Sequence, residues 1–210
     1  AAYVSPTLIT HRGIRQLLCA TSNFIFGVNP ENGTIAWRVN IKEELDRGRH
    51  IRRWGIVANS LAYLDGKVLM SNGYNQGGLM LELDDTASSA KILWKNFDMA
   101  SQHHGFVILG DKLYETTHHA PKFACIDLQT GKTIFNDQIA HLRQGQIITA
   151  DGLLYIYDST RGNVILAKPV PEKGFEEISR FKFTDGSGEH WCHPVIANKV
   201  LYIRRGDTLV

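Results

Sequence analysis

The sequence predicts an all-β protein, specifically a β-propeller built from four-stranded antiparallel blades. Three observations lead to this prediction. A hairpin pattern of apolar strand, short turn and apolar strand recurs along the chain, and a second hairpin pattern follows most of its copies. The two hairpins together repeat about every 45 residues, which is the spacing of a propeller blade. No repeat carries the 3.6-residue apolar period of an amphipathic helix.

The first hairpin of each repeat contains a two-residue turn of Asp, Asn or Gly type. These residues tolerate the positive φ angles that tight hairpin turns require. Its copies occupy residues 61–73, 106–117, 147–159 and 194–207, with a looser copy at 8–21.

The second hairpin of each repeat closes with an aromatic residue. Its copies occupy residues 24–37, 79–94, 123–135 and 164–181, and they end at Trp37, Trp94, Phe135 and Phe181. Because a single four-stranded sheet cannot bury both of its faces, neighbouring blades must pack against each other. We expect the closing aromatics to lie between neighbouring blades.

The repeats place all blades in a single propeller spanning residues 1–210. The blades occupy residues 5–41, 59–96, 105–139, 145–183 and 193–210. The last one lacks its second hairpin, so we expect four complete blades plus part of a fifth, as a fragment of a larger propeller of roughly 6–8 blades. The open sheet edges of such a fragment would permit self-association.

Composition excludes some partners. The net charge is +2, so no strong field points to a nucleic acid. No apolar run approaches the roughly 20 residues of a membrane span. No signal-peptide pattern is present, and the chain begins at Ala1. Cys19 and Cys125 fall within apolar strand patterns, where cysteine acts as a small buried hydrophobe.

The second hairpins resemble a known family. "CIDLQTGKTIF" and "GVNPENGTIAW" resemble the repeat of pyrroloquinoline-quinone-like (PQQ-like) propellers. The longer stretches "YVSPTLITHRGIRQLL", "SNGYNQGGLMLEL", "HHGFVILGDKLY" and "EHWCHPVIANKVLYIRRGDTLV" are similar to bacterial, extracytoplasmic members. The resemblance implies a periplasmic or secreted protein. Some members of this superfamily are quinoprotein alcohol dehydrogenases that carry PQQ and calcium, whereas others are scaffolds, such as the lipoprotein of the outer-membrane protein assembly machine.

The motifs of the dehydrogenases do not carry over to this chain. Those enzymes hold a pair of adjacent cysteines against the quinone, and this sequence has none. Its acidic residues lie mostly in turns, as Asp84, Asp85, Asp127 and Asp151 do, where they have turn and solubility roles. We therefore predict no catalytic residue and no metal ligand; PQQ and calcium remain possible through the resemblance only.

Histidines supply the candidate binding site. Two pairs, His103 with His104 and His190 with His193, immediately precede an innermost strand, so they should lie at one opening of the propeller. The ligand-binding candidates are Asn59, His103, His104, Gln144, His190, Trp191 and His193. Imidazoles there could bind a polar ligand or a metal; alternatively, they hydrogen-bond to loop backbones. We expect His118 and His119, in a loop between strands, to be exposed at the far end.

The insertion at residues 42–55 interrupts the repeat between the first two blades. It mixes charges of both signs, and we consider Arg47, Arg49, Arg52 and Arg53 candidates to contact an anionic partner; a solvated surface is the alternative. We expect one or two helical turns in this segment.

Three functions remain open. The first is a non-enzymatic binding or assembly scaffold of the cell envelope, whose partner is an unknown protein or a small polar ligand. The second is a quinoprotein alcohol dehydrogenase or a degenerate relative. The third and weakest is a carbohydrate-binding or carbohydrate-active propeller.

Overall fold

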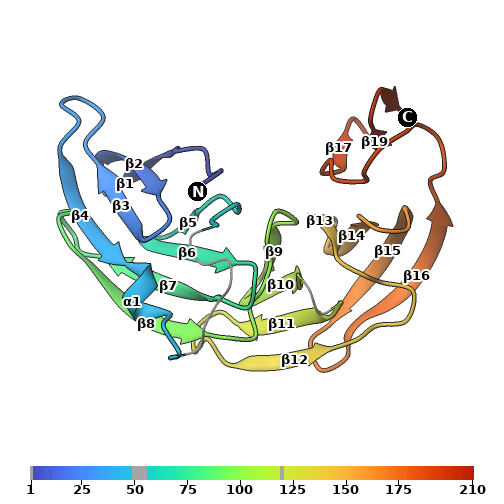
Figure 1. Cartoon of the computed structure of the whole chain (residues 1–210), viewed down its shortest axis with the longest axis horizontal. Helices are drawn as coiled ribbons and strands as arrows, with labels where there is room; N and C mark the ends of the chain where they lie inside the picture. The colour runs from blue at the N-terminus through green and yellow to red at the C-terminus, as the bar shows by residue number, and fades with distance from the viewer. Residues whose placement is uncertain (1, 49–55, 119–120) are drawn as a thin grey trace. The chain divides into compact units, whose positions relative to one another are not determined.

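The computed structural model describes residues 2–48, 56–118 and 121–210, and it divides the chain into two compact units, Ala1–Gln102 and His103–Val210. Each unit is described by itself. Nearly all regular structure is antiparallel sheet (Figure 1). Within the described residues the single helix is α1 (Ile41–Glu44), capped by the Asn40 side chain. No helix in this part of the chain is long and apolar enough to span a membrane.

The first unit contains two four-stranded sheets whose strands pair in chain order. Their strands are β1 (Thr7–His11), β2 (Ile14–Ala20), β3 (Phe24–Val28) and β4 (Ile35–Asn40), then β5 (Ala62–Leu64), β6 (Lys67–Asn72), β7 (Gly77–Leu83) and β8 (Ala90–Asn96). Buried side chains from both sheets form one apolar core, to which Leu18, Ile25, Val68 and Leu79 belong.

The second unit contains two further four-stranded sheets and two short hairpins. Their strands are β9 (Phe106–Leu109), β10 (Lys112–Thr116), β11 (Phe123–Asp127), β12 (Thr133–Asp137), β13 (Gly145–Ala150), β14 (Leu153–Asp158), β15 (Asn163–Val170), β16 (Gly174–Lys182), β17 (Val195–Ala197), β18 (Val200–Tyr202), β19 (Arg204–Arg205) and β20 (Thr208–Leu209). The two large sheets share a core, and a smaller cluster around Tyr157 and Phe183 joins the second of them to Ile203. The predicted class, four complete blades plus part of a fifth, is confirmed.

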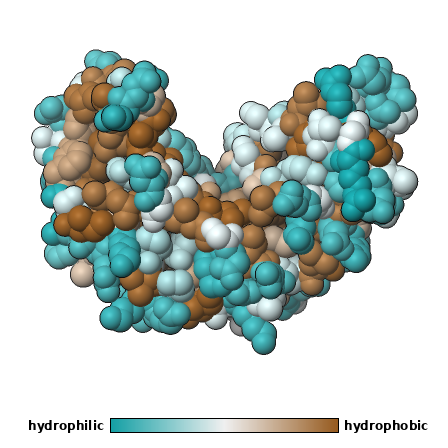
Figure 2. All heavy atoms as spheres, turned by 180° about the vertical axis from the view of Figure 1, so that it is seen from behind, coloured by the Kyte–Doolittle hydropathy of each residue, from teal (hydrophilic) through white to brown (hydrophobic). Residues whose placement is uncertain are grey.

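The sheet of β17 and β18 leaves one apolar face in water. Val195 pairs with Tyr202 and Ala197 pairs with Val200, so these side chains share a face of the sheet. Val195, Val200 and Tyr202 are all exposed. Figure 2 shows apolar side chains on the C-terminal segment at the upper left. The other face contributes Leu201 to the cluster around Tyr157.

Local turn chemistry explains why the sequence repeats itself. In the turn after β11, the Asp127 carboxylate accepts hydrogen bonds from the backbone and hydroxyl of Thr130, at 2.8 and 2.7 Å. Gly131 follows with φ near +69°, a conformation that favours glycine. The twin turn after β3 has the same backbone bond, since the Gly33 amide donates to the Asn29 carbonyl as the Gly131 amide donates to the Asp127 carbonyl. The recurring motif therefore encodes a turn.

Each four-stranded sheet also contains one β-bulge between its third and fourth strands. The register shifts next to Gly27, Met80, Cys125 and Leu166. Each bulge leaves one residue of the fourth strand without a partner in the third strand. In three sheets the residue that follows this unpaired residue is a closing aromatic. Trp37 and Trp94 are buried, and Phe135 packs against the core of its unit.

Phe181 is the exception, and the prediction that it packs between blades is wrong. Its side chain is 52% exposed. The pairing of Ser179 with Leu166 puts Ser179 at the position that Trp37 occupies in the first sheet. The bulge thus places the equivalent position two residues before Phe181. Phe183, which is buried, supplies the aromatic contact with Tyr157 instead.

Trp37 links the first two sheets through a polar contact. Its indole N–H donates to Gln16 Oε1 at 3.0 Å, and Gln16 Nε2 donates to the Ala87 carbonyl, in the β7–β8 turn, at 2.6 Å. Gln16 is buried. A Cβ atom on Gly27 would lie 2.4 Å from the indole nitrogen, so only glycine leaves room for the ring.

Candidate functional site

Strand reversal determines which loops of a sheet lie together. In a four-stranded antiparallel sheet, the start of the first strand lies at one end of the sheet. The loop between the second and third strands and the end of the fourth strand lie at that same end. We call this the loop end and the opposite end, with its short turns, the turn end. His103 and His104 precede β9, Gln144 precedes β13, and His190, Trp191 and His193 precede β17, so each lies at the loop end of its own sheet.

His118 also lies at a loop end, and the expectation of the far end was wrong. It follows β10, the second strand of its sheet, and the reversal brings this loop back to the end where β9 begins. The ring is half-buried rather than exposed, and Nδ1 lies 3.1 Å from Gln144 Oε1. His119 lies outside the described residues.

The candidate residues of the second unit form a cluster of aromatic and polar rings. We use the name histidine cluster for His103, His104, His118, Gln144, Trp191 and His193. The ring centroids of His103 and His104 are 4.1 Å apart, and those of His103 and Trp191 are 4.8 Å apart. His193 Nε2 lies 3.2 Å from the His103 carbonyl oxygen. A Cβ on Gly105, whose φ is near +74°, would lie 2.9 Å from the His193 ring, so glycine is needed for this approach.

His104 is the buried centre of the cluster. Its side chain has no exposed surface, and neither ring nitrogen has a hydrogen-bond partner among the described residues. Burial, followed by the charges of His103, His118 and His193, lowers its pKa to about 2. Burial and then His193 lower the pKa of His103 in the same direction. Both imidazoles are therefore neutral at pH 7, and a ligand would reach Trp191, which is 54% exposed, and His193 before His104.

His190 makes its contacts away from these rings. Its Nδ1 is bonded to the hydroxyl of the buried Tyr157, and the two rings meet edge-on at 5.3 Å. Burial and then the charge of Arg205 lower the pKa of His190. Its environment is a cleft lined by basic residues, distinct in composition from the histidine cluster.

Asn59 and Arg47 belong to the first unit and have local partners there. Asn59 is buried and donates to the carbonyls of Ser71 and Ser101 at 3.2 and 2.7 Å, so its amide ties loop backbone together. The Arg47 guanidinium lies 4.8 Å above the Phe97 ring, a cation–π contact. Arg49, Arg52 and Arg53 lie outside the described residues.

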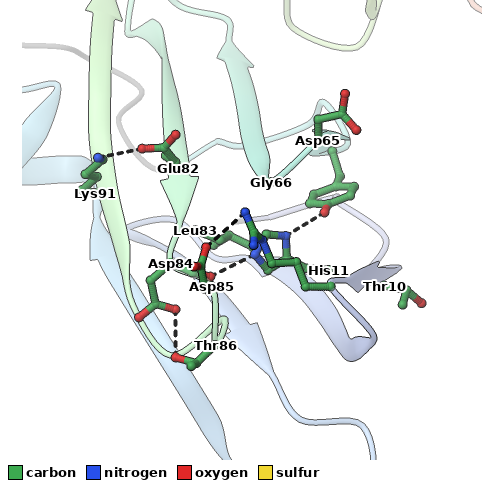
Figure 3. A pocket seen from close by; sticks show the side chains of 12 residues that line it. Thr10, His11, Asp65, Gly66, Glu82, Leu83, Asp84, Asp85, Thr86 and Lys91 are labelled. Atoms are coloured by element: carbon green, nitrogen blue, oxygen red, sulfur yellow. Dashed lines mark hydrogen bonds and ion pairs between the residues drawn. The ribbon is translucent and has the colours of Figure 1, made fainter.

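A second cleft, at the turn end of the first unit, was not predicted from the sequence. It encloses about 900 Å³, and Figure 3 shows its side chains. His11 lies 2.9 Å from both the Tyr63 hydroxyl and the Asp84 carbonyl. Three turns far apart in the sequence build this cleft, so no local motif pointed to it.

The charges of this cleft are largely satisfied within it. Arg12 pairs with Asp85 at 3.2 Å and Lys91 pairs with Glu82 at 2.7 Å. A backbone hydrogen bond from Ser88, together with nearby hydroxyls, lowers the pKa of Asp84. Because most of its charged groups are engaged by ion pairs or by hydrogen bonds from neighbouring residues, the cleft offers fewer groups to a ligand than its size implies.

The chemistry of the histidine cluster does not fit a quinone held by calcium. Calcium takes oxygen ligands, chiefly carboxylates and carbonyls, whereas the cluster offers imidazoles, an indole and one amide. Among the described residues, no group of three His, Cys, Asp or Glu side chains is placed to hold a metal ion. Cys125 is buried, and burial raises its pKa to about 11, as expected of a core cysteine.

Together, the repeated four-stranded sheets and the PQQ-type turns define the chain as a PQQ-like β-propeller protein. A family model described as "Outer membrane protein assembly factor BamB" matches residues 2–137. Because this match covers more than half of the chain, the protein belongs to that family. No curated protein matches the chain significantly.

Solved structures agree on the fold. BamB from Moraxella catarrhalis has a TM-score of 0.67 at 14% identity, covering 99% of this chain and 56% of that one. The computationally designed Ika8 protein has a TM-score of 0.60 at 8% identity, covering 95% and 55% of the two chains. Saccharomyces cerevisiae Sqt1 has a TM-score of 0.58 at 11% identity, covering 83% and 49%. The chain thus spans about half the length of these structures.

Proposed function

We propose that this protein is an extracytoplasmic binding scaffold that engages a protein partner through the loop-end surface of its second unit. Membership of the BamB family supports a scaffold role and a location in the cell envelope, periplasmic and associated with the outer membrane. The observation that carries the binding surface is the exposed Trp191 ring, which packs against the His103 ring at a tilted angle of 53°.

The physical basis is the energetics of protein interfaces. Tryptophan is enriched among the residues that dominate binding energy, because a large rigid ring buries much surface at a small entropic cost. Trp191 leaves 54% of its surface in water. Its ring packs against the His103 ring, which in turn packs against the buried His104 ring. A pre-ordered aromatic ring loses little further freedom when a partner covers it.

Site-specific photo-crosslinking in the native cell envelope tests the proposal. A photoreactive amino acid is placed in the full-length protein at Glu189, which is exposed beside Trp191, and at Asp151, which is exposed at the turn end of the β13–β16 sheet. We expect a discrete protein adduct from position 189, and no such adduct from position 151. Trp191→Ala should abolish the adduct at position 189.

Two outcomes would overturn the proposal. One is the absence of a protein adduct at position 189, or an equal adduct at both positions. The other is catalysis: reduction of an artificial dye in the presence of PQQ, calcium and simple alcohols would identify the protein as an enzyme. A glycan array tests the carbohydrate-binding alternative in the same way.

A further inference from the structure

The cleft that contains His190 is a candidate binding site separate from the histidine cluster. The cleft encloses about 370 Å³ in the second unit. Its polar lining side chains are all hydrogen-bond donors at neutral pH, and none is a carboxylate: Thr160, Arg161, Lys182, Thr184, His190 and Arg205. A surface recess in which every polar side chain can donate a hydrogen bond, and three of these side chains are cationic, is complementary to an anion.

The loop that carries Arg161 is fixed by an internal carboxylate. Asp158 is fully buried at the end of β14, and its Oδ1 accepts hydrogen bonds from the amides of Thr160 and Arg161 at 2.8 and 2.9 Å. Its Oδ2 accepts from the Arg143 amide at 3.3 Å. Asp158 thus shapes the loop, and among the described residues no ion pair joins it to the Arg161 side chain.

Arg205 is held in place by backbone carbonyls. Its Nε donates to the Gly188 carbonyl at 2.9 Å and its Nη1 donates to the Thr184 carbonyl at 3.1 Å. Nη2 has no hydrogen-bond partner among the described residues. Two fixed donors orient the guanidinium plane, so Nη2 can bind an oxyanion without a further loss of side-chain freedom.

His190 presents a further donor. The Tyr157 hydroxyl is buried, and burial raises its pKa to about 12, so it keeps its proton. A buried hydroxyl must donate that proton, and His190 Nδ1 is its hydrogen-bond partner in the described part of the chain. His190 Nδ1 is therefore the acceptor, and in the neutral ring the proton lies on Nε2. This tautomer leaves an N–H donor on a ring that lines the cleft.

The cations of the cleft have no protein counter-ion. No carboxylate of the described residues lies within ion-pair distance of Arg161, Lys182 or Arg205. Glu189 and Asp158 are close enough to act on the charge of His190, as Arg205 and Lys182 are, but neither neutralises the three cations. We propose that this cleft binds a doubly charged oxyanion, a phosphate or sulfate group, either free or as an ester on a larger molecule. The inference does not depend on the scaffold role.

Isothermal titration calorimetry of the full-length protein at low ionic strength tests this site, with inorganic phosphate, sulfate, glycerol phosphate and acetate as probes. We expect the dianions to bind more tightly than acetate. An ester that binds more tightly than inorganic phosphate identifies an esterified ligand, and equal affinities identify a free oxyanion; both support the site. Absence of dianion binding, or acetate binding as tight as phosphate, would overturn it.

Paired variants separate the site from general surface charge. Arg205→Gln should weaken phosphate binding roughly tenfold or more, as loss of a charge-assisted hydrogen bond does. Arg204→Gln removes the same charge from the neighbouring exposed residue, which does not line the cleft, and should weaken binding far less. Because Arg205 also ties two carbonyls, Arg161→Gln provides a second variant whose side chain has no such structural bonds. Equal losses in the Arg204 and Arg161 variants would refute the proposal.

Discussion

The enclosed imidazole of His104 should make the folded protein acid-sensitive. In the unfolded chain a histidine has a pKa near 6.5, whereas burial lowers the pKa of His104 to about 2 in the folded state. Below pH 6.5 the unfolded chain therefore takes up a proton that the folded protein does not. Stability that is fully present above this pH must fall as the pH falls towards 2.

The magnitude follows from the distance between the working pH and the unfolded pKa. A pH of 5.0 lies roughly 1.5 pH units below the pKa of histidine in the unfolded chain, and each unit corresponds to about 1.4 kcal/mol. His104 alone should therefore lower the free energy of unfolding at pH 5.0 by about 2 kcal/mol. Domains of this kind unfold with about 5–15 kcal/mol, so the loss is measurable. Asp127, whose pKa is lowered to about 2 by Thr130, stays ionised in this window and does not confound it.

The measurement is urea unfolding, followed by far-ultraviolet circular dichroism, at pH 7.5 and 5.0 for the wild type and His104→Gln. Glutamine keeps a polar side chain of similar size but takes up no proton. We expect the wild type to lose about 2 kcal/mol more than the variant between these pH values. His141→Gln, at an exposed residue, controls for removal of an imidazole. An equal loss in the wild type and His104→Gln would refute the reasoning.

Two further predictions concern the contact between the first two sheets. Gln16→Leu leaves the buried N–H of Trp37 and the Ala87 carbonyl without a partner, and should lower the free energy of unfolding by about 2–4 kcal/mol. Adding Trp37→Phe should recover part of this loss in urea unfolding, and strict additivity of the two changes would contradict the pairing. Gly27→Ala would place a methyl group against the Trp37 indole and should cost about 1–3 kcal/mol; an unchanged melting temperature would show that the ring moves aside freely.

The blade pattern could be predicted from the sequence because the features that specify it are local. Asp65 with Gly66, and Asp151 with Gly152, adopt positive φ at both turn positions, as their residue types predict. The bulge in the β15–β16 pair is not local. It depends on how two strands align over their whole length, so the spacing of aromatic residues selected Phe181 although the equivalent position is Ser179.

The sequence predicts at which end of each sheet the candidate residues lie, but it does not predict which of them come together or the chemistry of the resulting site. Reversal of successive strands alone assigns His103 and His118 to the same end, and counting reversals would have placed His118 correctly from the sequence. Grouping within that end depends on how neighbouring sheets pack. Packing encloses His104 and removes it from any ligand, and it brings His190 next to Arg205 instead of adding a fifth imidazole to the histidine cluster. The chemical contrast between the two sites, packed imidazole and indole rings in one and cations without a counter-ion in the other, therefore arises from tertiary contacts that no single segment encodes.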